Sequence, residues 1–270
     1  MEQNDPQSVT GHSPGPEKNL TDPAGKPAPW YQPAPWQFDL AWPRYLKLTA
    51  VLLLLAVAFV FDTPIARWLY QHPVVFKSDV NLELIWAMQF GQWTCSVIVI
   101  LAVALIDPQG RRRAIALATG CLSAVACCYL FKGLFGRTRP WVLHNGLYHF
   151  LGPAYGFGHG ASYQSFPSAH TSGAFALAAG LSWFYPRGRG LFYFMGLVVA
   201  WQRVMRHAHF PSDVVAGGLL AVIVVRTALW LGWPGKLIAL FPRQWQAWIF
   251  TDNETRASGK PENGKFGRPA

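Results

Sequence analysis

The chain has 270 residues, of which 51% are hydrophobic and only 13% are charged, and its formal net charge is +10. In soluble domains about a quarter of the residues are usually charged, so this composition argues against a soluble domain and favours an integral membrane protein. The positive residues lie mostly in short connections between apolar runs, as residues that orient membrane helices do. We therefore expect the membrane bilayer, and no nucleic acid, as a partner.

The two ends of the chain differ in composition from its middle. Residues 1–46 are rich in proline, glycine, asparagine and glutamine, and then in proline and tryptophan. We expect a disordered tail there, with its last aromatic residues at the level of the lipid headgroups. Residues 233–270 begin as an amphipathic stretch and continue as a polar, disordered tail. The predicted membrane domain between the tails covers residues 47–232.

Six apolar runs each predict a membrane-spanning helix, so the expected fold class is an all-α, integral membrane bundle of six transmembrane helices. The predicted spans are residues 45–61, 82–106, 114–131, 168–185, 191–202 and 211–231. Residues 62–81 read as a polar connection with a short surface helix at 64–71. Polar, uncharged side chains such as Gln89 and Gln92 interrupt the second run.

Six spans place both termini on the same side of the membrane. Most of the basic residues that flank the spans then fall on that side: Arg44, Lys47, Arg111, Arg112, Arg113, Arg187, Arg189, Lys236 and Arg243. Positive residues concentrate in cytoplasmic connections, so we expect both termini on the cytoplasmic side of a bacterial inner membrane. Three unusual polar segments, residues 132–140, 167–170 and 203–213, then meet on the opposite, periplasmic face.

Five cations lie in these segments, on the face that should be poor in them: Lys132, Arg137, Arg139, Arg203 and Arg206. Phosphoryl transfer depends mainly on positioning and on stabilising the charge that spreads over the phosphate oxygens. Arginine suits bidentate contacts to such oxygens, and lysine supplies a point charge. For Arg137 and Arg206 the alternative to phosphate binding is that their long side chains anchor the protein at the lipid headgroups.

Two histidines accompany the cations. His209 and Asp213 are four residues apart at the start of the sixth span, where the carboxylate can orient the imidazole as in a triad. His209 is therefore a candidate nucleophile toward phosphorus. His170 lies in the first turn of the fourth span and could protonate a leaving oxygen. Ser168 and the backbone N–H groups at that helix start can hold phosphate oxygens.

The three segments resemble the signature motifs of the type 2 phosphatidic acid phosphatase superfamily. The motifs are Lys132-x6-Arg139-Pro140, Pro167-Ser168-Ala169-His170 and Arg203-x5-His209-x3-Asp213. The resemblance covers about residues 47–232 and implies a membrane phosphatase with a core like that of the related haloperoxidases and no metal. It implies that His209 forms a phosphohistidine with support from Asp213, and that His170 protonates the leaving group. The implied phosphate-binding residues are Lys132, Arg139, Ser168, Ala169 and Arg203.

Two positions depart from the usual pattern of this superfamily. Ala169 stands where the superfamily commonly has glycine, and Gln202 stands where it commonly has serine. Ala169 would be strained if its backbone needed a positive φ. Gln202 keeps the ability to hydrogen-bond. Neither change removes a charged or nucleophilic group.

The function expected from these observations is a metal-independent lipid-phosphate phosphohydrolase. Its candidate substrates are phosphatidylglycerol phosphate, phosphatidic acid, polyprenyl pyrophosphate and a lipid A-type phosphate. The alternatives are a lipid phosphotransferase with the same intermediate and a non-catalytic protein that binds or transports lipid phosphates. His144, His149 and His159 match no compact metal-ligand spacing, so no metal or other cofactor is expected. Nothing in the sequence predicts an oligomeric state.

Overall fold

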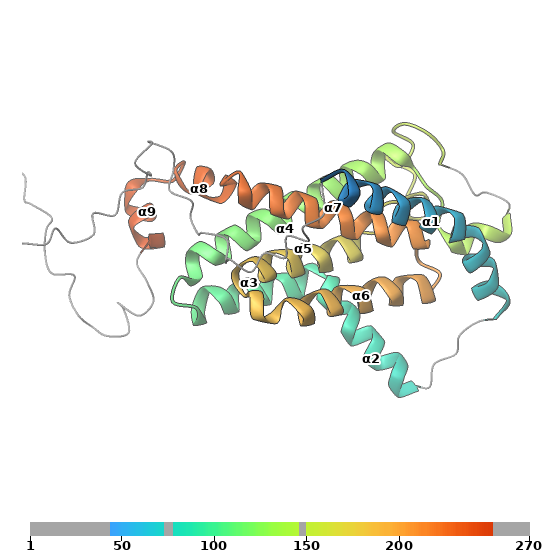
Figure 1. The fold of residues 1–270 in the computed structure, drawn as a ribbon, viewed down its shortest axis with the longest axis horizontal. Coiled ribbons are helices and arrows are strands. Elements are labelled where there is room, and N and C mark those ends of the chain that lie inside the picture. Colours follow the sequence, from blue (N-terminus) through green and yellow to red (C-terminus); the bar gives the residue numbers. More distant parts are fainter. Residues whose placement is uncertain (1–43, 73–77, 146–149, 251–270) are drawn as a thin grey trace, which may run out of the picture. The chain divides into compact units, whose positions relative to one another are not determined.

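The computed structural model describes residues 44–72, 78–145 and 150–250, and Figure 1 shows their fold. The α-helices are α1 (Arg44–Gln71), α2 (Ser78–Met88), α3 (Trp93–Ile106), α4 (Gly110–Phe135), α5 (Ala169–Phe184), α6 (Arg189–Met205), α7 (Pro211–Trp230), α8 (Trp233–Ile238) and α9 (Arg243–Phe250). The described part of the chain contains no β-strand beyond one isolated bridge, between Arg137 and Phe150. The predicted disordered tails fall mostly on residues 1–43 and 251–270, which lie outside the described residues.

Helix α5 forms the centre of the bundle and packs against α4, α6 and α7. Its buried positions are mostly alanine, glycine and serine, which let neighbouring helices approach closely. Gly180 shows this best, because a Cβ atom there would lie 2.6 Å from a Leu117 methyl group. Helix α1 packs on α7 at the edge of the bundle.

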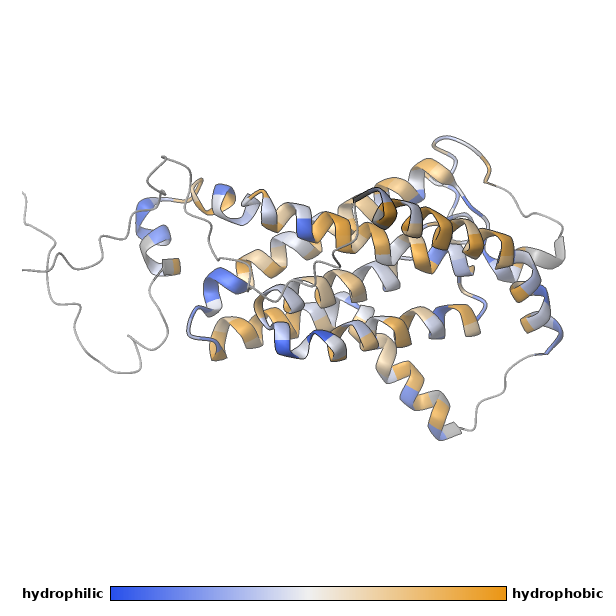
Figure 2. Cartoon of the chain, in the orientation of Figure 1, coloured by the Kyte–Doolittle hydropathy of each residue, from blue (hydrophilic) through white to orange (hydrophobic). Residues whose placement is uncertain are grey.

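Hydrophobic residues make up much of α1 and α3, as the orange stretches in Figure 2 show, and many of their large side chains are exposed. Three helices are long and apolar enough to cross a membrane, namely α1 from Leu48, α4 and α7. The pair α2–α3 makes a fourth if it is one broken span. Helices α5 and α6 have 16 and 17 residues. At 1.5 Å per residue they are about 24 to 26 Å long, against about 30 Å for the hydrocarbon core.

The second predicted span, residues 82–106, is not one helix. It divides into α2, a 3₁₀ turn (Gln89–Gly91) and α3, and the two halves are bent by 64°. Gly91 packs so tightly on α5 that a Cβ atom there would lie 2.4 Å from the carbonyl oxygen of His170. The polar residues Gln89 and Gln92, which interrupt the apolar pattern, therefore mark the break in this helix.

The prediction that the first span ends at residue 61 and that a separate surface helix covers 64–71 is wrong. Helix α1 continues without interruption to Gln71, although Pro64 removes one internal hydrogen bond. Asp62, in the predicted polar connection, is instead buried inside the protein. Its partners on α7 and on the loop after α4, described below, explain why a carboxylate is stable within this helix.

Candidate active site

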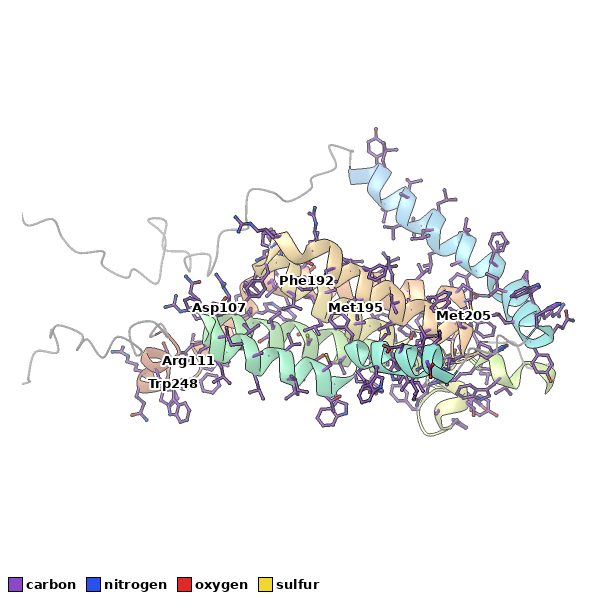
Figure 3. All side chains as sticks on the ribbon, turned by 90° about the horizontal axis from the view of Figure 1, so that it is seen from below. Asp107, Arg111, Phe192, Met195, Met205 and Trp248 are labelled. Carbon is purple, nitrogen blue, oxygen red and sulfur yellow. The ribbon has the colours of Figure 1, made fainter. Side chains whose placement is uncertain are left out.

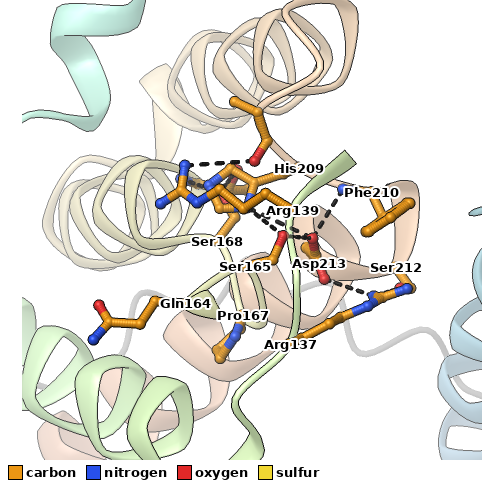
Figure 4. Close-up of polar contacts among 12 residues, drawn as sticks. Arg137, Arg139, Gln164, Ser165, Pro167, Ser168, His209, Phe210, Ser212 and Asp213 are labelled. Atoms are coloured by element: carbon orange, nitrogen blue, oxygen red, sulfur yellow. Dashed lines mark hydrogen bonds and ion pairs between the residues drawn. The ribbon is translucent and has the colours of Figure 1, made fainter. Parts of the chain in front are cut away.

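The three polar segments lie together where α4 ends and where α5 and α7 begin, as Figure 4 shows. Backbone contacts join them directly. The Ser168 N–H donates to the carbonyl oxygen of Asp213 at 3.0 Å, and the Ser165 N–H donates to that of Arg137 at 2.9 Å. Gly217 permits the first contact, because a Cβ atom there would lie 2.6 Å from the Ser168 carbonyl oxygen.

His209 lies in the turn before α7 and is 2% exposed. Its Nδ1 is 3.6 Å from Oδ2 of Asp213, which is longer than an ordinary hydrogen bond. Ser165 lies beside both groups: its Oγ donates to Oδ2 of Asp213 at 2.5 Å and is 3.5 Å from Nδ1 of His209. The sequence prediction missed Ser165, although it stands only three residues before Ser168.

Burial lowers the pKa of His209 to about 3, which outweighs the opposite effect of Asp213. Because this pKa lies below the ordinary value of 6.5, the imidazole is neutral at every pH well above 3. A neutral imidazole has a free electron pair on one nitrogen, which a nucleophile requires. Since Nδ1 faces Asp213 and Ser165, the nitrogen that remains for attack is Nε2.

Asp213 is fully buried and has a partner on each carboxylate oxygen. Its Oδ1 accepts from Nη1 of Arg137 at 2.6 Å. Its Oδ2 accepts from Ser165 and from the N–H of Phe210, the latter at 2.8 Å. These contacts fix the orientation of the carboxylate toward His209.

The interpretation of Arg137 as a headgroup anchor is wrong. Its side chain is buried and pairs with Asp213 and with Oδ2 of Asp62, each at 2.6 Å. The rings of Phe59, Phe150 and Phe210 lie 5.4, 4.9 and 4.3 Å from the guanidinium carbon. Arg137 is therefore an internal counter-ion. Arg206, the other candidate anchor, is exposed.

Asp62 is the second residue that the sequence prediction missed. It accepts hydrogen bonds from the N–H of Ser212 at 2.8 Å, from the Ser212 hydroxyl at 2.5 Å and from Arg137. The signal was present, because an acidic residue close to an apolar run is costly unless it has a function or a partner.

Lys132, Arg139 and Arg203 make up the remaining cations of the motifs. Lys132 is buried and its Nζ donates to the carbonyl oxygen of Gln164. Arg139 donates from Nε to the carbonyl oxygen of Ala161 at 2.8 Å, and burial lowers its pKa. Arg203 contacts Met88 on α2. All three cations lie within electrostatic reach of His170.

His170 lies in the first turn of α5, beside the break between α2 and α3. The side-chain nitrogen of Gln92 is 3.0 Å from its Nε2. An amide nitrogen can only donate, so Nε2 of His170 accepts this hydrogen bond. Gln92 was expected only as an interruption of an apolar run, and its contact with His170 is a further feature that the sequence prediction missed.

Ser168 and Ala169 begin helix α5. Ser168 is buried and caps the helix, since its Oγ accepts from the Thr171 N–H at 3.5 Å. Ala169 is the first helical residue, and the described non-glycine residues with positive φ are Ala154 and His207 alone. The strain considered for Ala169 is therefore not present. Gln202 is buried, and its Oε1 has no hydrogen-bond partner within the described ranges.

A cavity of about 400 Å³ opens beside His170 and Ala169 and extends between α3 and α4. Apart from Gln92, Ser96 and His170, its walls are mostly apolar, with residues such as Val97, Leu101, Leu122 and Val125. The apolar space is therefore lined by two motif residues, Ala169 and His170, and His170 in turn lies within electrostatic reach of the three cations. The described residues contain no group of three or more histidine, cysteine or acidic side chains placed to hold a metal ion.

Comparisons with known proteins agree with the resemblance carried by the three motifs. The family model described as the PAP2 superfamily, the type 2 phosphatidic acid phosphatases, matches residues 113–236. A lipid A 1-phosphatase of Rhizobium johnstonii is 36% identical over 118 residues, which cover 43% of this chain and 47% of that protein. A lipid A 1-phosphatase of Rhizobium etli is 34% identical over 124 residues, or 43% and 49% of the two chains.

A more distant relative is an undecaprenyl-diphosphatase of Bacillus subtilis, 27% identical over 128 residues, which cover 47% of this chain and 62% of that protein. The chain thus spans about half the length of the two lipid A 1-phosphatases it matches. No solved structure matches the chain.

We expect Arg137→Gln to be strongly destabilising, because it leaves Asp62 and Asp213 buried without their counter-ion. The expected loss is about 3 to 5 kcal/mol. Thermal unfolding of the purified protein in detergent measures it, with Arg206→Gln as the control. Arg206 is exposed, so its substitution should change stability by no more than about 0.5 kcal/mol. Equal melting temperatures for the two variants would contradict the internal role of Arg137.

Proposed function

We propose that this chain, whose residues 113–236 form a domain of the PAP2 superfamily, is a membrane lipid-phosphate phosphohydrolase that acts through a phosphohistidine. The observation that carries the proposal is His209. Its imidazole is buried and neutral, its Nδ1 faces Asp213, and Lys132 and Arg139 stand nearby. These two cations and Arg203 also act on His170. Such a group has the components of nucleophilic catalysis on phosphorus.

In the first proposed step, Nε2 of His209 attacks phosphorus, and the bond from phosphorus to the leaving oxygen breaks. His170, which is protonated when the anionic phosphate is bound and then no longer accepts from Gln92, gives a proton to that oxygen and becomes neutral. The positive charge that develops on the imidazole faces the carboxylate of Asp213, which stabilises it. Lys132, Arg139 and Arg203 bind the phosphoryl oxygens, together with the N–H groups at the start of α5.

In the second step, water attacks the phosphohistidine and the nitrogen–phosphorus bond breaks. His170, now deprotonated, accepts the proton of the attacking water. Inorganic phosphate leaves and His209 returns to its neutral form. No metal ion is needed in either step, because the cations of the chain supply the positive charge.

The apolar cavity beside His170 supports a lipid substrate, because an acyl or prenyl chain can occupy it while the phosphate lies among the cations. The relatives named above are phosphatases of lipid A and of undecaprenyl diphosphate. We therefore place lipid A-type phosphates and polyprenyl pyrophosphates first among the candidate substrates. Phosphatidic acid and phosphatidylglycerol phosphate follow.

We also propose that the chain spans a bacterial inner membrane six times, with the site at the periplasmic face and both termini in the cytoplasm. In this arrangement α2–α3 is one broken span, and α5 and α6 are short spans. The buried position of α5 supports this, because neighbouring helices rather than lipid surround it. Short spans are accommodated by local thinning of the bilayer at modest cost.

Phosphate release from lipid phosphates in detergent with EDTA tests the proposed reaction. We expect the wild type to release phosphate and His209→Ala to lose at least about 10³-fold in kcat, because the nucleophile is gone. His159→Ala is the matched control, since His159 is exposed in the loop between α4 and α5 and stacks on Tyr155. It should retain wild-type activity.

Three other outcomes of this assay would contradict the proposed reaction or favour one of its alternatives. Release that is unchanged in His209→Ala would contradict the proposed nucleophile. Release by the wild type only when an acceptor lipid or sugar is present would identify a phosphotransferase. Binding of lipid phosphate without any turnover would favour the non-catalytic alternative.

Reporter fusions test the proposed orientation in the membrane. A reporter after Trp141, in the loop between α4 and α5, should be periplasmic, and one after Arg187, in the turn between α5 and α6, should be cytoplasmic. The reason is that α5 separates the two positions and the basic turns favour the cytoplasm. Alkaline phosphatase and fluorescent protein fusions give the readout. The reverse pattern, or both reporters on one side, would contradict the proposed topology.

A further inference from the structure

A charged network extends beyond the three motifs and reaches helix α1. Arg137 lies between two buried carboxylates, with Nη2 on Asp62 and Nη1 on Asp213, each at 2.6 Å. The Ser212 hydroxyl joins the same network, since it accepts from Nη1 of Arg137 at 2.6 Å and donates to Asp62 at 2.5 Å. One cation between two carboxylates leaves a formal negative charge on the group.

The sign of this charge matters for Asp213. An arginine that paired with Asp213 alone would neutralise it, and the carboxylate would then offer less stabilisation to a cationic imidazole. Because Asp62 shares the guanidinium of Arg137, the group of Arg137 and Asp213 with Asp62 is not neutral. The side chains of Asp62 and Asp213 are 5% and 0% exposed, so water screens these interactions little.

Asp62 also fixes the position of helix α7. It accepts the N–H of Ser212, in the first turn of α7, at 2.8 Å. Such N–H groups have no partner inside the helix and need one from elsewhere. The residue before the helix, Phe210, has no side-chain acceptor for them, so a carboxylate from α1 takes the place of a local cap. Asp213 stands next to Ser212 and is held by the same contact.

We propose that Asp62 is a positioning residue for the reaction: through Arg137 and Ser212 it orients Asp213 and preserves its negative charge for the His209 imidazole. This inference depends on the proposed phosphohydrolase function. It assigns a role in the chemistry to α1, which lies outside residues 113–236 that match the family model. The Asp62 carboxylate is 5% exposed and its contacts are with Arg137 and Ser212, so we expect its effect on the chemical step and not on binding.

The test is Asp62→Asn, with Asp107→Asn as the matched control. The Asp107 side chain is 10% exposed and pairs with Arg113 at 2.5 Å, so it resembles Asp62 in burial and pairing. It accepts from Tyr185 at the far end of α5, and Figure 3 shows it far along the bundle from Met205, where α6 ends near the site. Loss of a carboxylate there should leave the chemical step unchanged.

We expect Asp62→Asn to lower kcat about 10- to 100-fold, as substitution of residues that orient a reactive group through its neighbour commonly does. KM and the inhibition constant of inorganic phosphate should each change less than about threefold, because the phosphate-binding cations are intact. Rates are divided by the fraction of folded protein, measured by size exclusion in detergent. Asp107→Asn should match the wild type in all three constants.

A second variant covers the case in which Asp62→Asn does not fold. Ser212→Ala removes the hydroxyl that bridges Arg137 and Asp62 but keeps every charge, so it should fold and lower kcat several-fold without changing KM. Wild-type kcat in Ser212→Ala together with unfolded Asp62→Asn would assign the network to stability alone and overturn the proposal. Folded Asp62→Asn with wild-type kcat would also overturn it, while the proposed hydrolysis stands. An inactive wild type would overturn both.

Discussion

The structure of this site depends on one buried carboxylate, that of Asp213. A charge without water is stable only with close partners, and those of Asp213 come from separate parts of the chain. Arg137 comes from the loop after α4, Ser165 from the segment before α5, and the Phe210 N–H from the turn before α7. The need to satisfy this group therefore brings together the ends of three helices, and Asp62 adds the fourth.

Two opposite electrostatic demands meet within a small volume. A phosphate site needs cations, but nearby cations and burial both lower the pKa of His209 and oppose the positive charge that it must carry during the reaction. The arrangement separates the two demands. In the proposed reaction Lys132, Arg139 and Arg203 bind the phosphate and Asp213 supports the imidazole, whereas Arg137 faces Asp62 and Asp213. Arginine side chains thus have different roles in this site because they contact different groups.

The sequence predicted the parts of the site that are local, and it missed the parts that depend on distant contacts. The starts of α5 and α7 lie at or next to the predicted positions, because serine and proline mark helix starts. The internal role of Arg137 depends on partners 75 and 76 residues away, and the contact of Asp62 with Ser212 joins residues 150 apart. The hydrophobic periodicity of the sequence contains no information about such distant pairs. The break at Gln89–Gly91 was missed because an apolar pattern continues on both sides.

The central claim is that His209 carries the phosphoryl group, and trapping that intermediate tests it most directly. The purified protein is mixed with a lipid phosphate whose phosphoryl oxygens carry a heavy isotope, quenched in alkali within milliseconds, digested and analysed by mass spectrometry. We predict the label on the peptide that contains His209, at the imidazole, and none in Asp213→Asn within the same time. Rapid turnover with no labelled peptide, or a label on another residue, would contradict the claim.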